Sequence, residues 1–335
     1  MKVDGGIGGL DGAAAMAKAQ EDEGLDGLWS AETGHDPFVP LLLASQSTER
    51  IELGTGIAVA FARSPMTTAM TANDVQLASK GRHILGLGSQ IKPHIEKRFS
   101  MPWSRPAPRM REFVLAMRAI WDSWNNGSKL EFRGEFYTHT LMTPFFSPGA
   151  NPYGPPKVFL AAVGEHMTQV AGEVCDGMLV HPFTTERYLK DVTMPAIERG
   201  LAAGERKRED FQLAYTGFVV TGNDQEKEAA AGMVRSQVSF YGSTPAYRGV
   251  LEQHGWGDLQ TELNALSKQG RWADMSNLIT DEILETFAVV ADVDDVPARL
   301  FERFGGVIDR IGFYVPLGGG PDAKKQIVQT LQAAA

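Results

Sequence analysis

The stretch 51-IELGTGIAV-59 is a short apolar run interrupted by glycines, and 83-HILGL-87 is a second run of the same kind. Residues 66–79, which lie between them, have the length and apolar spacing of a helix. Short apolar runs separated by a helix are typical of parallel strands, because a parallel pair needs a long crossover connection. The stretch therefore predicts a strand, a helix and a second, parallel strand.

The same alternation continues in both directions along the chain. Strands are expected at residues 2–7, 26–30, 51–59, 83–87, 157–163, 177–181, 212–220 and 310–315. Helices are expected at residues 13–23, 38–47, 66–79, 109–124, 167–174, 187–203 and 225–240. Eight strand and helix units predict an α/β fold, a (β/α)8 TIM barrel, for which roughly 250 residues are typical.

The remaining residues predict insertions into one barrel domain that covers residues 1–335. One insertion is expected near 102–156, with a hairpin around 130–137 and a loop rich in Pro and Gly. The other is expected near 242–280, after the seventh strand. Active sites of this fold lie at the C-terminal ends of the strands, so the loops that follow the strands are the place to search.

Composition excludes several classes of protein. The chain has 335 residues, of which 43% are hydrophobic and 22% charged, as in ordinary globular proteins. Its net charge of −9 disfavours general binding of nucleic acid, and its apolar runs are too short to span a bilayer. The single cysteine, Cys175, is expected to be a small buried apolar residue. We therefore expect a cytoplasmic protein with a small-molecule substrate and neither nucleic-acid nor membrane partners.

The expected strand ends carry histidines and glycines. Four of the seven histidines fall there, namely His35, His94, His166 and His181. Glycines at the same ends leave room for a large flat ligand, such as a flavin-type ring, to lie against backbone, although glycines also simply end strands. No paired histidines follow the first strand, so no metal site is expected. No nucleophile motif of the G-x-S-x-G type is present, which disfavours hydrolysis.

A basic stretch leaves the fourth strand at this face. Residues 92–111 hold six Lys or Arg residues and Glu96 as the one acid. Such a stretch can receive a phosphate or a polyanionic tail, and a solvated helix face or a subunit contact explains it equally simply. Both interpretations stay open from the sequence.

Four runs together resemble the bacterial luciferase-like superfamily: 24-GLDGLW-29, 51-IELGTGI-57, 81-GRHILGLG-88 and 171-AGEVCDG-177. The resemblance covers nearly the whole chain. Within it, 35-HDPF-38 and the turn 88-GSQ-90 are most similar to the branch that uses the deazaflavin coenzyme F420. The resemblance implies a luciferase-like TIM barrel that binds the ring at its mouth and moves a hydride between the ring and a small organic substrate.

The resemblance also assigns expected roles to residues. His35 or Asp36 would handle the proton that accompanies the hydride, because an imidazole titrates near neutral pH and an adjacent carboxylate can tune it. For Asp36, capping of the following helix is the alternative. The expected cofactor-binding residues are Gly56, Ile57, Ala58, Gly88, Ser89, Gln90, Lys92, Gly164, Glu165 and His166. The expected substrate-binding residues are Trp29, Trp103 and His181.

Two further expectations come from the same resemblance. Family members often carry a non-proline cis peptide bond at the end of the third strand, which corresponds here to Gly56-Ile57 or the next bond. Family members are also commonly dimers, so a homodimer is expected.

The sequence leaves alternatives open for the substrate, the cofactor and the function. Sugar-phosphate dehydrogenases of the F420 branch have a glutamate in the turn after the fourth strand, where this chain has 89-SQI-91, so their substrate is not transferred here. Reduction of an activated alkene or carbonyl and oxidation of an alcohol are both open. An FMN-dependent monooxygenase, which uses oxygen, is the first alternative function. A cofactor-binding homologue without turnover is the second, and a barrel without redox chemistry, such as an aldolase, is the third.

Overall fold

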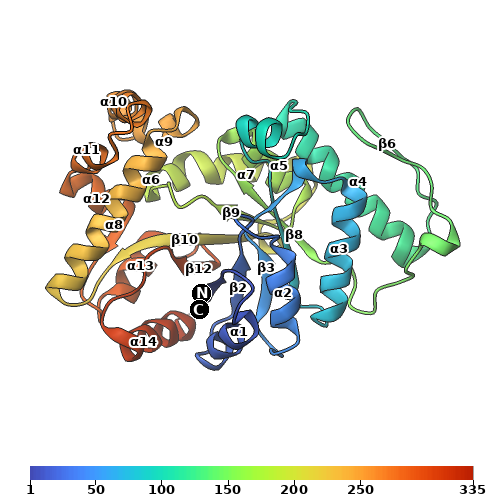
Figure 1. The fold of residues 1–335 in the computed structure, drawn as a ribbon, viewed down its shortest axis with the longest axis horizontal. Helices are drawn as coiled ribbons and strands as arrows, with labels where there is room; N and C mark the ends of the chain where they lie inside the picture. Colours follow the sequence, from blue (N-terminus) through green and yellow to red (C-terminus); the bar gives the residue numbers. More distant parts are fainter. Residues whose placement is uncertain (335) are drawn as a thin grey trace.

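The computed structural model describes residues 1–334 and contains a closed barrel of eight parallel strands (Figure 1). In the order around the barrel, the strands are β1 (Lys2–Ile7), β2 (Gly27–Ser30), β3 (Glu52–Thr55), β5 (His83–Gly88), β8 (Lys157–Ala162), β9 (Gly177–Val180), β10 (Gln212–Val220) and β12 (Arg310–Phe313). The barrel closes because β12 pairs with β1. These eight strands confirm the predicted TIM barrel.

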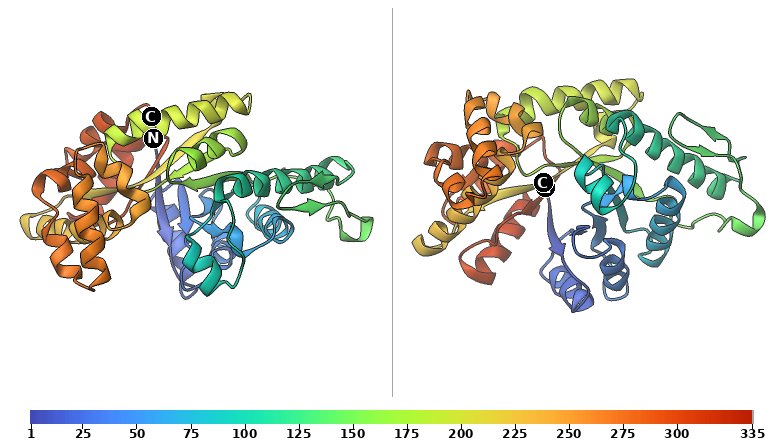
Figure 2. Two further views of the ribbon diagram at one scale, coloured as in Figure 1. Left: turned by 90° about the horizontal axis from the view of Figure 1, so that it is seen from above. Right: turned by 45° about the horizontal axis from the view of Figure 1, so that its top comes forward.

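Helices surround the barrel (Figure 2). Those that follow the expected units are α1 (Ala13–Asp22), α2 (Phe38–Ser45), α3 (Pro65–Ala78), α4 (Pro106–Asn126), α5 (Glu165–Val174), α6 (Glu186–Tyr188), α7 (Met194–Ala203) and α8 (Asp224–Gly242). The C-terminal part adds α12 (Asp281–Phe287), α13 (Val296–Phe304) and α14 (Gly320–Ala333). The N-terminal amine donates a hydrogen bond to the carbonyl of Leu331 in α14, 3.3 Å away, so the two ends lie side by side.

Both expected insertions contain structure of their own. In the first, β6 (Phe132–Arg133) pairs antiparallel with β7 (Thr138–His139), and this arm projects from the side of the barrel (Figure 1). In the second, the helices are α9 (Arg248–Glu252), α10 (Gly257–Lys268) and α11 (Trp272–Asn277). They pack with α8 and α12 around Val238, Leu263 and Met275, in a hydrophobic cluster separate from the main core.

Two short strands were not expected as separate elements. β4 (Ala58–Val59) follows β3 after a break at Gly56 and Ile57, and it pairs with the end of β5. β11 (Ala288–Val290) lies directly after α12 and pairs with β10 outside the barrel. A strand of three residues offers too little alternation to be seen in a sequence.

The barrel interior is filled by large side chains set beside glycines. Ile84, Phe159 and Ala214 form a buried cluster with the partly buried Trp29 and Leu179. In the sheet, Trp29 lies opposite Gly6 on one side and Gly54 on the other, and a side chain at Gly54 would overlap the Trp29 ring. Some glycines that were expected to clear the mouth therefore make room for interior aromatic rings instead.

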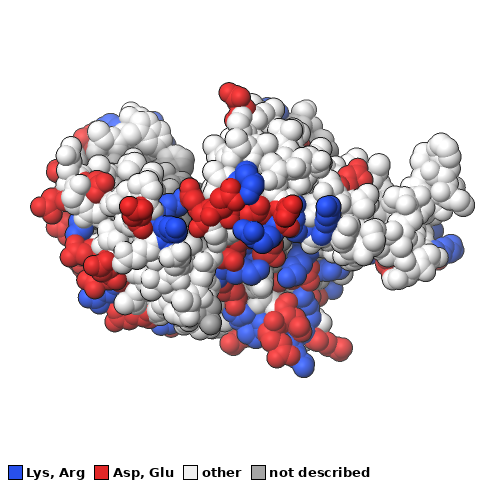
Figure 3. All heavy atoms as spheres, turned by 90° about the horizontal axis from the view of Figure 1, so that it is seen from below, with Lys and Arg blue, Asp and Glu red and all other residues white. Residues whose placement is uncertain are grey.

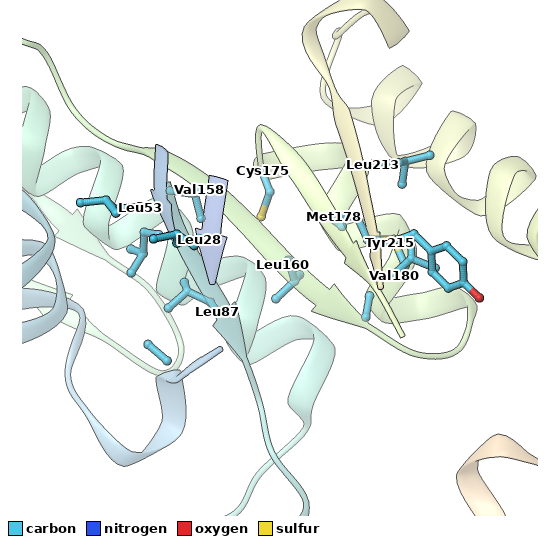
Figure 4. Packing of buried hydrophobic residues seen from close by; sticks show 14 of the residues in the cluster. Leu28, Leu53, Leu87, Val158, Leu160, Cys175, Met178, Val180, Leu213 and Tyr215 are labelled. Atoms are coloured by element: carbon cyan, nitrogen blue, oxygen red, sulfur yellow. The ribbon is translucent and has the colours of Figure 1, made fainter. Parts of the chain in front are cut away.

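Residues at the alternate strand positions form the core between strands and helices. Leu28, Leu53, Val158 and Leu160 belong to this layer and are fully buried (Figure 4). Cys175 lies in the same layer, and burial raises the pKa of its thiol to about 12. The interpretation of Cys175 as a small buried apolar residue is confirmed.

Candidate active site

A cavity of about 1180 Å³ lies at the C-terminal ends of the strands. All eight barrel strands, or the residues that directly follow them, contribute to its lining. One representative residue from each is Asp4, Trp29, Gly56, Gly88, Ala161, Leu179, Ala214 and Gly312. Ligand sites in proteins typically have volumes of about 300 to 1,000 Å³, so this cavity has room for a large ligand and a second molecule.

The same cavity extends away from the barrel between two helices. α4 contributes Ala107 and Arg111, and α5 contributes Gln169 and Glu173. The Arg111 guanidinium pairs with the Glu173 carboxylate at 2.7 Å. The lining of this one cavity therefore joins the barrel mouth to residues of α4 and α5.

The structure places most of the predicted binding residues on this cavity. The cofactor candidates that line it are Gly56, Ile57, Gly88, Ser89, Gln90, Lys92, Gly164, Glu165 and His166. The substrate candidates that line it are Trp29, Trp103 and His181. Their roles in binding stay predictions. Ala58 is not among the described residues of the lining, because it is fully buried in β4, next to Leu87.

The bond between Gly56 and Ile57 is a cis peptide bond, as expected, and it lies between β3 and β4. Both residues line the cavity. The Ile57 side chain packs against Gly88, where a side chain would collide with it. Backbone and one aliphatic side chain therefore form this wall.

Among the described residues that line the cavity, neither His35 nor Asp36 is found, and both are exposed. The Asp36 carboxylate accepts a hydrogen bond from the backbone N–H of Phe38, the first residue of α2, at 2.9 Å. It also pairs with Arg63 at 2.7 Å. These contacts match the alternative for Asp36, a role at the start of the helix. A catalytic role for His35 or Asp36 stays a prediction, and this geometry does not support it.

The basic stretch 92–111 is divided by the fold. Only Lys92 and Arg111 line the cavity among its described basic residues. The Arg109 guanidinium lies 4.3 Å from the centre of the Phe61 ring and donates a hydrogen bond to the Tyr137 hydroxyl at 2.8 Å. Arg105 pairs with Glu135. Most of the stretch therefore serves local packing and surface pairing.

The first residues of α5, Glu165, His166 and Met167, line the cavity together with Gly164. Gly164 precedes the helix at φ 78°, and no described side chain caps it. The Glu165 carboxylate pairs with Arg199 at 2.9 Å. Because helix N-termini carry partial positive charge, this end suits an anionic group.

His181 follows β9 and contacts a residue that sequence reasoning missed, Tyr247. The backbone N–H of Phe183 donates to Nδ1 of His181 at 3.0 Å, and Nε2 lies 3.2 Å from the Tyr247 hydroxyl oxygen. Burial lowers the pKa of His181 to about 4, so the imidazole is neutral at pH 7. Tyr247 lines the cavity from the second insertion, and no motif in that insertion indicates it.

Asp4 is a second residue of the cavity lining that sequence reasoning missed. Its carboxylate accepts two hydrogen bonds from Arg310, at 2.7 and 2.8 Å, and one from the Trp29 indole N–H at 2.8 Å. The signal in the sequence is an acid in the middle of the first strand, between Val3 and two glycines. Because its oxygens are already bonded, Asp4 orients Trp29 at the floor of the cavity.

Comparison with known proteins identifies the family. The sequence profile described as luciferase-like monooxygenase matches residues 2–310. The chain belongs to this family.

Several individual proteins resemble the chain over most of its length. An uncharacterised protein of Mycobacterium tuberculosis is 58% identical over 313 residues, which cover 93% of this chain and 92% of the relative. The 5,10-methylenetetrahydromethanopterin reductase of Archaeoglobus fulgidus is 29% identical over 320 residues, which cover 92% and 90%. The coenzyme F420 dependent tetrahydromethanopterin reductase of Methanopyrus kandleri shares the fold, with a TM-score of 0.79 at 20% identity and coverage of 100% and 99%.

Two further observations concern the described residues as a whole. No group of three or more His, Cys, Asp or Glu residues among them is arranged to hold a metal ion. None of the helices in the described part of the chain combines the length and the hydropathy that crossing a membrane requires.

Proposed function

We propose that the protein is an F420-dependent oxidoreductase that moves a hydride between the deazaflavin ring and a small organic substrate. The observation that carries the proposal is the single large cavity, whose lining joins the barrel mouth to residues of α4 and α5. Coenzyme F420 has the corresponding shape, since a flat ring is attached to a phosphate and an oligoglutamate tail. Relatives that use this coenzyme add support.

The residues of the cavity fit such a group. Gly56, Ile57 and Gly88 form a wall of backbone and one aliphatic side chain against which a flat ring can lie. The N–H groups that follow Gly164 would receive the phosphate, and Lys92 would attract the acidic tail. When bound, F420 supplies the hydride donor or acceptor.

The chain's own residues would orient the substrate and exclude water. Trp29 and Trp103 offer large apolar faces in the cavity, and Trp29 is fixed by its hydrogen bond to Asp4. Gln90 lies on the lining as an amide, which can donate and accept hydrogen bonds but cannot titrate. The proton must therefore come from another group or from water.

An FMN-dependent monooxygenase is the second candidate, favoured by the family to which the chain belongs. FMN has a similar ring and one phosphate but no acidic tail, so it would leave the extension between α4 and α5 largely unfilled. A cofactor-binding homologue without turnover would bind F420 equally well and show no hydride transfer.

The test is a paired titration of the purified apoprotein with F420 and with FMN, followed by tryptophan fluorescence at two salt concentrations. We expect F420 to bind with a micromolar or lower dissociation constant and to bind more weakly at high salt. We expect no binding of FMN. Preference for FMN would favour the second candidate, an FMN-dependent monooxygenase that uses oxygen. Binding of neither would overturn the cofactor assignment.

A further inference from the structure

We propose that Tyr247 is a catalytic residue that donates a hydrogen bond, and then a proton, to the oxygen of a carbonyl substrate, and that His181 positions it. This inference deepens the proposed function and rests on it. The observations that carry it are the contacts of His181 with Phe183 and Tyr247 and the presence of both His181 and Tyr247 on the cavity lining.

The hydrogen bonds determine which nitrogen of His181 carries the proton. A backbone N–H can only donate, so Nδ1, which lies 3.0 Å from the N–H of Phe183, must accept. In a neutral imidazole the proton is then on Nε2, which faces the Tyr247 hydroxyl at 3.2 Å. His181 therefore donates to the Tyr247 oxygen.

This arrangement leaves the hydroxyl proton of Tyr247 available. Its oxygen accepts from His181, so its own proton is free to point to another acceptor, and Tyr247 lines the cavity. The neighbouring Tyr241 differs: its ring packs on His181 at 4.7 Å, but its hydroxyl bonds to that of Tyr314 at 3.0 Å. Tyr241 is not among the described residues that line the cavity.

The chemistry of the donor indicates the class of substrate. Tyr247, His181 and the nearby lining residue Thr244 are neutral groups, which suit an uncharged carbonyl oxygen better than a carboxylate. During reduction, the carbonyl carbon accepts the hydride from reduced F420, and the electron pair of the C=O π bond moves to oxygen. The oxygen takes the Tyr247 proton, the donated N–H of His181 stabilises the tyrosinate, and water returns a proton to it.

The first experiment uses the apoprotein and 2-cyclohexen-1-one labelled with ¹³C at the carbonyl, observed by isotope-edited infrared spectroscopy. In the wild type, the bound carbonyl stretch should shift to lower wavenumber because of the hydrogen bond. In Tyr247→Phe the shift should be lost, and in the matched control Tyr241→Phe it should remain. A wild-type protein that leaves the probe unbound or unshifted overturns the proposal, as does a shift that survives in Tyr247→Phe.

A second pair of variants tests the role of His181. His181→Gln can place a donor near the position of Nε2, so the shifted band should be retained. His181→Asn can accept from Phe183 but does not reach Tyr247, so the band should broaden toward the unshifted position. Equal bands in the two variants would contradict positioning by His181.

The same variants are then assayed with F420. Tyr247→Phe should reduce the rate of probe reduction by about 100-fold or more, the usual effect of losing a general acid, while the Kd of F420 stays unchanged. Wild-type activity in that variant would overturn the proton-donor role. The proposed function can fail independently of this inference. If F420 does not bind while the infrared shift is present, the carbonyl-binding role of Tyr247 is supported and the cofactor assignment is contradicted.

Discussion

The Asp4 carboxylate and the Arg310 guanidinium meet inside the barrel with side chains that are 2% and 0% exposed. Arg310 also pairs with Glu52, and Gly27 leaves the space that its side chain occupies. A buried charge is tolerated only while it is paired, because desolvation alone is very unfavourable. This pair therefore holds β1 against β12 and also fixes the floor of the cavity.

Replacing Arg310 by Met should lower the free energy of unfolding by about 3 to 5 kcal/mol, since Asp4 would remain buried without its partner. The control is Arg299→Met, which removes a pair with Glu302 whose side chains are 61% and 67% exposed. That change should cost less than about 1 kcal/mol. Urea unfolding of the three proteins measures both, and equal costs would contradict the structural role of the Arg310 pair.

His83 should make stability depend on pH. Its Nδ1 lies 2.8 Å from the Leu53 carbonyl, its Nε2 is buried without a partner among the described residues, and burial lowers its pKa to about 4. Between the unfolded pKa of 6.5 and about 4, only the unfolded chain binds the proton, so stability falls as pH falls through this window. The loss reaches about 3 kcal/mol near pH 4.

The variant His83→Asn tests this contribution. Asparagine can still donate to the Leu53 carbonyl but does not titrate. Urea unfolding at several pH values between 4 and 7 should give a shallower dependence in the variant than in the wild type. Parallel curves would show that the imidazole does not cause the loss.

At the scale of elements, α4 and α5 determine the shape of the site. The apolar face of α4 buries Phe113, Met117 and Trp121, so this helix covers the barrel while Arg111 faces the cavity. α5 begins beside the cavity because Gly164 adopts φ 78° and ψ 155°, a conformation that is nearly restricted to glycine. The backbone at Gly164 thus sets the direction of the first N–H groups of α5.

Gly164→Ala should weaken F420 binding, because the alanine would shift the backbone that starts α5. Gly149→Ala is the matched control: it also has a positive φ, of 77°, and open space around a new side chain, but it lies in the exposed loop before β8. Each change should cost about 1 to 3 kcal/mol of stability. Fluorescence titration should show weaker binding only for Gly164→Ala, and equal affinities would contradict the assignment of this helix end.

At the scale of the whole molecule, charges of both signs are interspersed over the face shown in Figure 3. The segment 140–156, which follows β7 in the projecting arm, contains no Asp, Glu, Lys or Arg. Leu141, Phe145 and Phe146, which follow β7, are 75%, 89% and 71% exposed. The homodimer stays a prediction, which sedimentation of the purified protein tests. The net charge of −9 repels an acidic ligand, so the local cations must provide the attraction.

Lys92→Gln should weaken F420 binding several-fold at low salt and reduce its dependence on salt, because Lys92 lines the cavity and is 62% exposed. Lys97→Gln removes an exposed lysine from the same segment that does not line the cavity among the described residues, and it should have little effect. Titrations at two ionic strengths compare the two. Equal losses of F420 affinity in the two variants would indicate that the overall electrostatic field of the protein attracts the ligand, and not a local contact with Lys92.

The sequence by itself determined the barrel, because the periods of strand and helix are local properties of the chain. It also determined the loops that line the cavity, since the ends of parallel strands must meet on one face. Only the tertiary structure decided which side chains reach the cavity. In the folded chain, Asp36 pairs with Arg63, Arg109 lies over the Phe61 ring, and Tyr247 from the second insertion contacts His181. Such pairings join positions far apart in sequence, so no local pattern encodes them.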